Sequence, residues 1–427
     1  MKAALDQWIR KKHGIGGAAD LKKWQSGKIK ELIKYVCEKS TFYRKHLAGC
    51  KIPETEAEFG RLPMMSENNL CEEGLKMLCV SQGEIKRAVT LHTSGTGGRP
   101  KRLYFTQEDL ELTVDFFCCG MREVVEEGDR AVVFLPCLRE DSVGNLLLKS
   151  LDRMKVTGYG PGPVENPGLA VRMLQAEKAD AFVGTPLQAL ALAEHAKAGK
   201  ASLMLKRILV STDYLADSVR KRIEQGLGCQ VFNHFGITEA GLGCAVECQC
   251  HNGMHIREND LLVEVIDPVS GRILPNGKRG EMVLTTLTRK GMPLIRYRTG
   301  DYCIMERKPC RCGSYLARIV KTEGRIKDRL KEGKDEISMA LMDEILFSID
   351  GLIDYGVKYQ ENEKILEVHM VFFQKEGGKA VLGEKMLRRM LAKRGFSDQA
   401  CRLQVTWEET ESWNPQYEGK RLIRRVG

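Results

Sequence analysis

The chain has 427 residues, of which 43% are hydrophobic and 29% are charged. This length exceeds one ordinary hydrophobic core and predicts two or three domains. The composition is that of a globular protein and excludes a mostly disordered chain. Lysine and arginine exceed aspartate and glutamate by 67 − 57 = 10. A basic balance favours anionic partners, and a solvated basic surface explains the same excess.

The compartment is expected to be the cytoplasm. The first residues, MKAALDQWIRKKHG, contain no apolar segment of the kind that a secretory signal needs. No run of about 18 apolar residues indicates a membrane span, so no membrane partner is expected. Fifteen cysteines, an odd number, in a long chain favour thiols in a reducing compartment over a disulfide framework.

The first two thirds of the chain predict an α/β fold. Apolar and basic positions recur at helical spacing over residues 18–47, which indicates one or two amphipathic helices. From about residue 88, short apolar strands alternate with helices, and this alternation predicts a largely parallel sheet. The expected strands are 131–135, 181–183, 207–210 and 230–232, and the expected helices are 143–154 and 216–226.

The last third changes character. Residues 260–305 contain short β-rich runs separated by turn residues, which predicts an antiparallel β subdomain at about 255–322. Beyond residue 325 the pattern is helix, strands, helix and strand. We therefore expect a large N-terminal domain, 1–324, and a small α+β C-terminal domain, 325–427.

A loop rich in glycine and hydroxyl side chains precedes Lys101. It contains Thr93, Ser94, Gly95, Thr96 and Gly97 and continues through Gly98-Arg99-Pro100. Glycines let backbone N–H groups approach phosphate oxygens, hydroxyls add donors, and lysine adds positive charge. The loop is not a Walker A motif, because Pro100 precedes the lysine and arginine follows it. Taken alone, a glycine-rich turn is weak evidence.

Further blocks follow the loop in a fixed order. They are HFGITEAG at His234–Gly241, RYRTGD at Arg296–Asp301, EGRIKD at Glu323–Asp328 and EGKRL at Glu418–Leu422. The loop and these blocks together resemble the adenylate-forming superfamily, which contains acyl-CoA synthetases, adenylation domains and luciferases. The stretches 40–47, 207–241 and 286–301 resemble the phenylacetate–CoA ligase branch in particular, and the resemblance covers nearly the whole chain.

The resemblance implies an enzyme that uses ATP to convert a carboxylic acid into an acyl-adenylate. It then implies transfer to coenzyme A, which gives acyl-CoA, AMP and pyrophosphate. An aryl or arylacetic acid is the favoured substrate. Mg²⁺ is the expected cofactor, and a homodimer is expected because relatives in this branch are often dimers. The C-terminal domain would act as a mobile lid that carries the catalytic lysine.

The resemblance also assigns roles to residues. The loop and Lys101 would hold the β- and γ-phosphates of ATP. Glu239 would hold Mg²⁺, since a hard cation prefers carboxylate oxygen, and Thr238 would contact the α-phosphate. Asp301 would accept both ribose hydroxyls, and Arg325 would also contact the ribose. The remaining nucleotide-binding candidates are Ser211, Thr212, Asp213, Phe235 and Gly236. Each could instead be an ordinary turn or surface residue.

Lys420 would be the adenylation lysine, which bridges the acid oxygen and the α-phosphate as negative charge builds up. Removing one such electrostatic group typically costs roughly 10²–10³ in turnover. The hinge of the lid would be Lys327 or Asp328, because domain closure needs a few residues that absorb the backbone change. Outside the family pattern, Lys420 is one more lysine in a basic tail.

Cysteines and histidines in two short segments predict a zinc site. One segment, ECQCHNGMH, contains Cys248, Cys250, His251 and His255, and the other, KPCRCGS, contains Cys310 and Cys312. These are enough soft ligands for one tetrahedral Zn²⁺, although Cys-x-Cys spacing is atypical and unmetallated thiols are the alternative. Some members of the branch carry a metal here. The expected structural ligands are Cys248, His255, Cys310 and Cys312, with Cys250 as the substitute.

The sequence departs from the family in two places. Gly97 stands where the loop usually has a second threonine, which predicts weaker ATP binding. Residues 329–339 match the branch poorly, so thioester formation is less supported than adenylation.

Two other functions stay open. One is an adenylating enzyme that uses an acceptor other than coenzyme A. The other is a zinc-containing, basic nucleic-acid-binding protein. No recognition helix or RNA-binding strand signature supports the latter, so no nucleic-acid partner is expected.

Overall fold

The computed structural model describes residues 3–91, 100–332, 335–373, 377–396, 401–411, 413 and 421–426. The chain forms two compact units. The first unit contains residues 1–123, 139–154 and 234–322, and the second contains 124–138, 155–233 and 323–427. No helix in these described ranges is both long and apolar enough to cross a bilayer.

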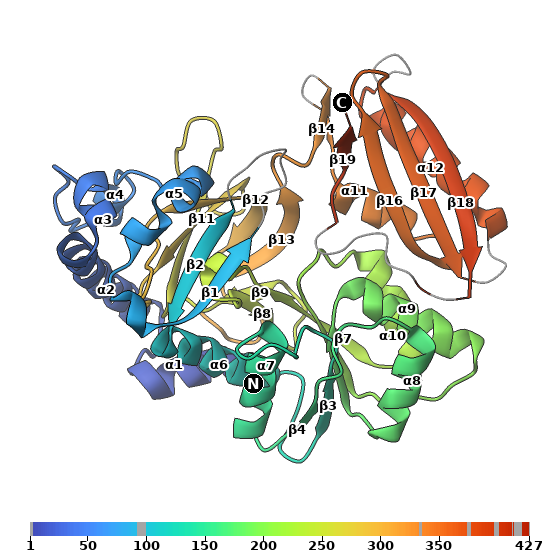
Figure 1. Ribbon diagram of the computed structural model, residues 1–427, viewed down its shortest axis with the longest axis horizontal. Helices are drawn as coiled ribbons and strands as arrows, with labels where there is room; N and C mark the ends of the chain where they lie inside the picture. Colours follow the sequence, from blue (N-terminus) through green and yellow to red (C-terminus); the bar gives the residue numbers. More distant parts are fainter. Residues whose placement is uncertain are drawn as a thin grey trace. The chain divides into compact units, whose positions relative to one another are not determined.

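The second unit contains a parallel sheet in the order β7-β6-β5-β3-β4. Its inner strands are short and almost entirely buried, as expected for strands covered on both faces. Helices α8, α9 and α10 accompany this sheet (Figure 1). The predicted α/β class is therefore confirmed. The bounds are β3 Arg130–Val133, β4 Thr157–Tyr159, α8 Pro167–Ala176, β5 Ala181–Gly184, α9 Pro186–Ala198, β6 Arg207–Val210, α10 Asp217–Leu227 and β7 Gln230–Phe235.

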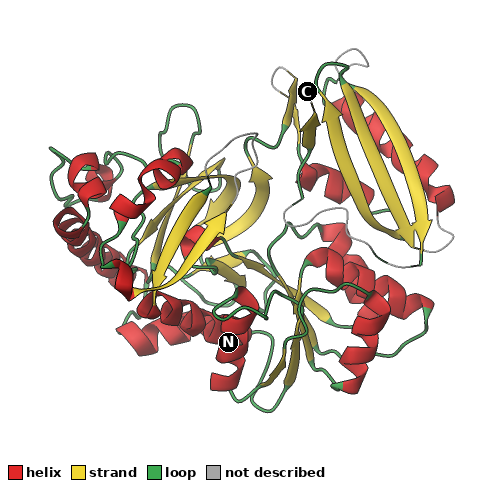
Figure 2. Ribbon diagram, viewed as in Figure 1, coloured by secondary structure: helices red, strands yellow, loops and turns green. Residues whose placement is uncertain are grey.

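The C-terminal part of the second unit contains a four-stranded sheet in the order β18-β17-β16-β19. Strands β16 and β17 form an antiparallel hairpin, and β18 and β19 are parallel neighbours at its two sides. Helix α12 lies against the sheet (Figure 2). The bounds are β14 Leu330–Glu332, β15 Asp335–Ile337, α11 Met339–Leu346, β16 Leu352–Gln360, β17 Ile365–Phe373, η4 Gly377–Lys379, α12 Ala380–Lys393, β18 Arg402–Thr410 and β19 Arg424–Val426.

The first unit contains an antiparallel sheet in the order β10-β11-β12-β13-β9-β8, which continues to the last two residues of β7. The β-rich runs predicted over residues 260–305 are β10, β11 and β12. Strand β7 crosses from one unit into the other, because its first residues pair with β6. The bounds are β8 Ala245–Glu247, β9 Met254–Ile256, β10 Leu261–Ile266, β11 Arg279–Thr286, β12 Tyr297–Glu306 and β13 Arg318–Arg325.

A hairpin and a layer of helices complete the first unit. The hairpin pairs β1 with β2, and its last described pair is Leu91 with Lys101. The predicted phosphate loop is the connection between these two residues. The bounds are α1 Ala4–His13, α2 Ala18–Lys39, α3 Thr41–His46, α4 Glu56–Phe59, α5 Glu67–Glu73, η1 Gly74–Met77, η2 Gln82–Glu84, β1 Ile85–Leu91, β2 Lys101–Thr106, α6 Gln107–Met121, α7 Val143–Arg153 and η3 Thr238–Ala240.

The start of α6 ties this hairpin to the antiparallel sheet. Thr106 and Asp109 form a capping box, in which each side chain accepts a hydrogen bond from the other residue's backbone N–H. The Asp109 carboxylate also accepts hydrogen bonds from the backbone N–H groups of Lys290 and Gly291, at 2.8 and 3.0 Å. One buried carboxylate therefore fixes β2, α6 and the segment after β11.

The sequence predicts that residues 325–427 move as a lid against residues 1–324. The two compact units divide the chain differently, since residues 323–427 pack with residues 124–138 and 155–233. The predicted division remains a prediction.

Candidate active site

A buried lysine and a buried glutamate meet in the first unit. Lys101 lies at the start of β2 and Glu239 in η3, and their side chains are 4% and 5% exposed. Lys101 Nζ lies 2.7 Å from Glu239 Oε1 and 3.0 Å from Glu67 Oε1. The hydroxyl of Tyr297 donates to Glu239 Oε1 at 3.4 Å. Two residues assigned to phosphate and metal binding are therefore in direct contact.

The turn that carries Glu239 depends on a close backbone approach. A Cβ on Gly236 would lie 2.0 Å from the carbonyl oxygen of Leu242, so only glycine fits at this position. The backbone N–H of Leu242 donates to the carbonyl of Ile237 at 3.0 Å and closes the turn. Phe235 and Thr238, both half-buried, lie in the same turn. The Gly236, Thr238 and Glu239 candidates thus occupy one compact structure.

Two buried arginines that the sequence analysis missed lie beside this turn. The guanidinium Nη2 atoms of Arg257 and Arg289 each lie 3.1 Å from the position that a Cβ on Gly241 would take. Burial lowers the pKa of Arg289 to about 10, so it stays cationic at neutral pH. Glu67, Arg257 and Arg289 are far apart in sequence from the turn, and no local pattern marks them.

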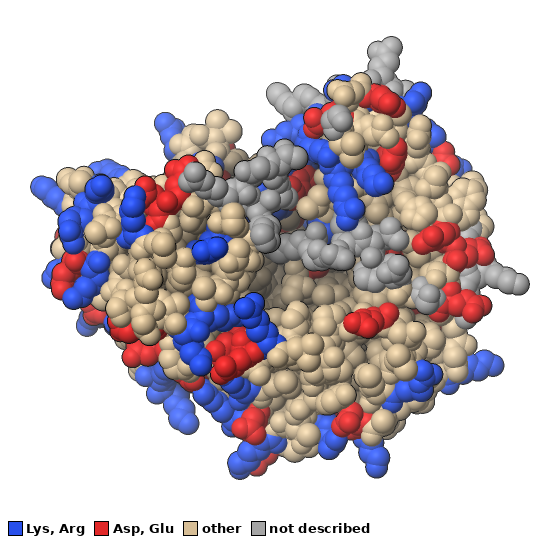
Figure 3. All heavy atoms as spheres, in the orientation of Figure 1, with Lys and Arg blue, Asp and Glu red and all other residues tan. Residues whose placement is uncertain are grey.

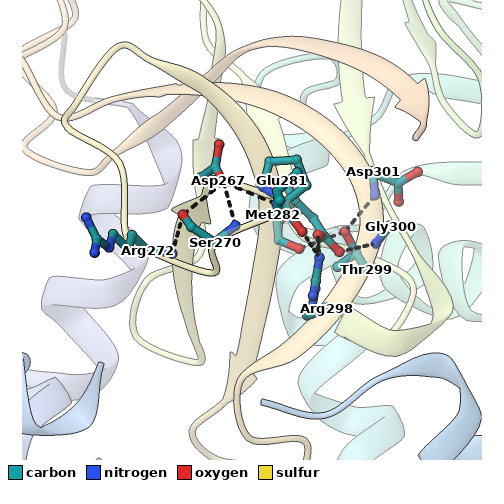
Figure 4. A network of polar contacts seen from close by, with 11 residues as sticks. Asp267, Ser270, Arg272, Glu281, Met282, Arg298, Thr299, Gly300 and Asp301 are labelled. Atoms are coloured by element: carbon teal, nitrogen blue, oxygen red, sulfur yellow. Dashed lines mark hydrogen bonds and ion pairs between the residues drawn. The ribbon is translucent and has the colours of Figure 1, made fainter. Parts of the chain in front are cut away.

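Asp301 lies in β12, and its main chain is held by a polar network. Glu281 accepts hydrogen bonds from the Arg298 guanidinium and, at 3.2 Å, from the backbone N–H of Gly300. The hydroxyl of Thr299 accepts from the backbone N–H of Asp301 at 3.1 Å. Figure 4 shows the Asp301 carboxylate directed away from Glu281 and Arg298. The network therefore fixes the backbone at Gly300 and Asp301 and does not use the Asp301 carboxylate in these hydrogen bonds.

The candidates Ser211, Thr212 and Asp213 lie in the second unit, directly after β6. Ser211 is buried and its backbone N–H donates to the carbonyl of Gly184 at 3.0 Å. Thr212 has a φ of 76°, a left-handed conformation that is uncommon for a threonine. The carboxyl ends of parallel strands are the usual place for ligand-binding residues in α/β sheets, and these three residues satisfy that rule.

The predicted hinge follows β13 in the second unit. Arg325 and Asp328 are half-buried, and Lys327 is exposed. Arg329, which is 3% exposed, donates to the Glu323 carbonyl and to the carboxylates of Glu323 and Glu336. Arg329 therefore joins the residues before the predicted hinge to those after it. No sequence motif marks Arg329, because its burial depends on ion pairs that only the folded chain shows.

Several of the assigned residues lie outside the described ranges. They are Thr93, Ser94, Gly95, Thr96 and Gly97 of the loop, and the lysine Lys420. Their assigned roles rest on the resemblance.

The four residues predicted as zinc ligands lie together in the first unit. Cys248 follows β8, His255 lies in β9, and Cys310 and Cys312 lie between β12 and β13; all four are buried. Their ligand atoms all lie within 4.8 Å of one another. Cys250 is half-buried and packs against the cluster. No disulfide involves any of the fifteen cysteines, all of which lie in the described ranges.

The distances in this cluster match a tetrahedral metal. Cys248 Sγ lies 3.9 Å from Cys310 Sγ, and Cys312 Sγ lies 3.4 Å from His255 Nε2. Tetrahedral zinc with Zn–S bonds of about 2.3 Å would separate two sulfurs by about 3.8 Å. Burial lowers the pKa of His255 to about 4, so its imidazole is neutral, which is the form that binds metals. The donor set and its spacing fit Zn²⁺.

The model of the family "AMP-binding enzyme" matches residues 69–287, which is just over half of the chain. The chain belongs to the AMP-binding enzyme family. The matched region contains Lys101, Gly236 and Glu239, so the buried contact lies within the family's own segment.

Individual relatives agree with the family assignment. The phenylacetate-coenzyme A ligase of Thermus thermophilus is 27% identical over 390 residues, which cover 86% of this chain and 85% of that protein. The phenylacetate-coenzyme A ligase of Pseudomonas putida is 27% identical over 323 residues, 73% of this chain and 72% of that protein. The predicted membership of the adenylate-forming superfamily and its phenylacetate–CoA ligase branch is therefore confirmed.

Solved structures show the same fold. A 2-hydroxyisobutyryl-CoA ligase in the postadenylation state gives a TM-score of 0.79 at 22% identity, and the match covers 96% of this chain and 90% of that chain. The same ligase in the thioesterification state gives a TM-score of 0.67 at 23% identity over 96% and 91% of the two chains. At these identities the likeness supports the fold of this family member and nothing finer.

Replacing Gly236 with alanine tests the turn. We expect Gly236→Ala to destabilise the protein by about 1–3 kcal/mol, because the added Cβ would overlap the Leu242 carbonyl. The matched control is Gly27→Ala in α2, where a Cβ meets nothing within 4 Å. That substitution should stabilise by about 0.5–1 kcal/mol. Urea unfolding measures both, and equal stabilities of the two variants would contradict the account of the turn.

Proposed function

We propose that this family member activates a carboxylic acid with ATP and transfers the acyl group to coenzyme A. The products are acyl-CoA, AMP and pyrophosphate. The observation that carries the proposal is the buried contact of Lys101 with Glu239, inside the segment that the AMP-binding family model matches. The names of the relatives, phenylacetate-coenzyme A ligases, favour an aryl or arylacetic acid.

Lys101 and the loop before it would bind the β- and γ-phosphates of ATP. A lysine held between two carboxylates is already in place, so it can exchange a carboxylate for a phosphate oxygen without reorganising the chain. Arg257 and Arg289 would add positive charge behind the turn. The buried position strengthens these interactions, since charges act over a lower effective dielectric there.

Glu239 would hold Mg²⁺ through its carboxylate, which is the ligand type that this cation prefers. Mg²⁺ would neutralise part of the charge on the phosphates. Thr238 lies beside Glu239 and would contact the α-phosphate. The turn closed by Gly236 would fix both side chains.

The candidates for nucleoside binding have separate roles. Asp301 would accept the two ribose hydroxyls, and Arg325 would add a ribose contact. Ser211, Thr212, Asp213 and Phe235 would meet the base. Residues 325–427 would act as the mobile lid, with the hinge at Lys327 or Asp328.

The adenylation lysine gives the direct test of the first half-reaction. Lys420→Ala should reduce acid-dependent ATP–pyrophosphate exchange by roughly 10²–10³, because one cation at the reacting oxygens is lost. The matched control is Lys385→Ala, an exposed lysine on α12 in the same part of the chain. Full exchange activity in Lys420→Ala would exclude this lysine from the chemistry.

Replacing Asp301 tests the ribose assignment. In the unchanged protein, ATP should be preferred to 2′-deoxy-ATP, because one carboxylate accepts from both hydroxyls. Asp301→Ala should lower kcat/KM for ATP by about tenfold or more, as expected for the loss of a hydrogen bond to a charged group. It should affect 2′-deoxy-ATP less. Steady-state kinetics with both nucleotides gives the preference, and an unchanged preference would contradict the assignment.

We also propose that Cys248, His255, Cys310 and Cys312 hold a structural Zn²⁺. What supports the site is the buried cluster of four ligand atoms within 4.8 Å of one another. The metal would join the segment after β8, the strand β9 and the turn between β12 and β13. A structural zinc contributes folding free energy directly, because the site does not exist in the unfolded chain.

Metal analysis tests the zinc proposal. Protein purified without chelator should contain about one zinc per chain. Cys310→Ser should remove it and lower the Tm by roughly 5–10 °C, which corresponds to a loss of about 2–3 kcal/mol. Cys50→Ser, which changes an exposed cysteine outside the cluster, should alter neither quantity. A zinc content near zero in the unchanged protein would exclude the site.

An acceptor other than coenzyme A is the second candidate. The observation that favours it is the poor family match of residues 329–339. Release of AMP that depends on coenzyme A would exclude this candidate. The nucleic-acid hypothesis has less support, because basic and acidic side chains are interspersed over the face shown in Figure 3.

A further inference from the structure

The turn that carries Glu239 ends in two consecutive residues with a left-handed backbone. Gly241, which follows the short helix η3, has a φ of 78°, and Leu242 has a φ of 68°. Glycine adopts this conformation readily, whereas it is uncommon for a leucine. Such a backbone persists only where the surrounding structure fixes it. The contacts that hold this turn therefore also fix the main chain beside Glu239.

Two side chains tie the turn to helix α6. The Thr113 hydroxyl, on α6 itself, donates to the carbonyl of Gly241 at 2.8 Å. The Nη2 atom of Arg257 donates to the carbonyl of Ala240. The Nη1 atom of the same guanidinium donates to the carbonyl of Leu112 in α6 at 3.3 Å. Two adjacent residues of α6 are therefore joined to two adjacent residues of the turn.

Arg257 holds the turn at both of its ends. Its backbone N–H donates to the carbonyl of Cys244 at 3.1 Å, beyond Leu242, while its side chain holds the turn before Leu242. The residue is only 3% exposed, and its guanidinium lies 5.1 Å from the centroid of the Phe116 ring. A buried charge costs desolvation energy. Arg257 thus defines the geometry of the turn more than it stabilises the fold.

Helix α6 is also connected to the partner of Glu239. It directly follows β2, which begins at Lys101, and Lys101 Nζ lies 2.7 Å from Glu239 Oε1. This contact shows that the carboxylate oxygen already faces a cation, and carboxylate oxygen is a ligand that Mg²⁺ prefers. One helix therefore carries the strand of Lys101 at its start and holds the turn of Glu239 along its length.

We propose that Arg257 and Thr113 are positioning residues for Glu239, and that they set the affinity of its carboxylate for the Mg²⁺ that accompanies ATP. This inference rests on the proposed function. Both side chains act through the carbonyls of Ala240 and Gly241, which directly follow Glu239. Removing a group that orients a metal ligand typically costs about 10–100-fold in metal affinity or activity.

Equilibrium dialysis tests the inference without turnover. The probe is radiolabelled α,β-methylene-ATP, in which the bond that adenylation breaks is replaced by an unreactive one. Binding is measured at fixed probe concentration over a range of Mg²⁺ concentrations. Arg257→Met keeps a long side chain and removes both carbonyl hydrogen bonds. It should raise the half-saturating Mg²⁺ concentration by about tenfold. Binding at saturating Mg²⁺ should stay within about twofold, because neither side chain contacts the nucleotide in this account.

The hydroxyl of Thr113 gives an independent and milder test. Thr113→Val removes this hydrogen bond with little change in shape, and it should raise the half-saturating Mg²⁺ concentration by about threefold to tenfold. Thr113→Ser keeps the hydroxyl and should restore the original value. The same shifts should appear in the Mg²⁺ dependence of acid-dependent pyrophosphate exchange. Thr113→Val provides the result if Arg257→Met does not fold.

The matched control is Arg318→Met. Arg318 is also buried, at 4% exposed, and it also donates to two carbonyls, those of Asn252 and Lys308. Both carbonyls lie outside the turn of Glu239, so the half-saturating Mg²⁺ concentration should not change. A purely structural role of Arg257 would lower binding to the same degree at every Mg²⁺ concentration.

The outcomes are distinct. An unchanged half-saturating Mg²⁺ concentration in folded Arg257→Met and Thr113→Val overturns the positioning role while the proposed function stands. An equal loss of binding at all Mg²⁺ concentrations does the same. Absence of exchange by the unchanged protein with every acid overturns the proposed function, and the positioning role with it. A shift in both variants that Thr113→Ser and Arg318→Met do not show supports the inference.

Discussion

The ion pair between Lys101 and Glu239 is the interaction on which the candidate site depends. It joins the start of β2, next to the predicted phosphate loop, to the turn that Gly236 closes. Both side chains are almost fully buried, so the charge of each is compensated by the other. Removing one partner of such a pair typically costs about 3–5 kcal/mol, because a buried charge is left uncompensated. The pair therefore keeps a cation and the carboxylate proposed to bind Mg²⁺ together, and Glu67, Tyr297, Arg257 and Arg289 complete its surroundings.

Much of the fold could be predicted from local patterns. Strand β6 has the predicted bounds 207–210, and α7 and α10 lie within one residue of their predicted ends. Buried parallel strands are short apolar runs, which explains why they stand out. The order of the sequence blocks also predicted the family. The hairpins β1–β2 and β14–β15 and the strand β19 were not predicted, because their residues are partly exposed and polar and lack a clear alternation.

The site was predicted less completely than the fold. Glu239, Asp301 and the proposed zinc ligands became candidates because family blocks or residue chemistry mark them. Glu67 and Arg289 were missed, since contacts between residues far apart in sequence leave no local periodicity. In these cases a charged residue in a basic or helical stretch resembles an ordinary surface residue. Only the folded chain shows that its side chain is buried.

The measurement that most directly tests the central claim is ATP–pyrophosphate exchange by the purified, unmodified chain with Mg²⁺. The panel should contain aryl, arylacetic and short aliphatic acids, followed by coenzyme A with the best acid. The account predicts exchange that depends on an added acid, strongest with an aryl or arylacetic acid, and release of AMP on addition of coenzyme A. A folded protein that supports no exchange with any of these acids would contradict it.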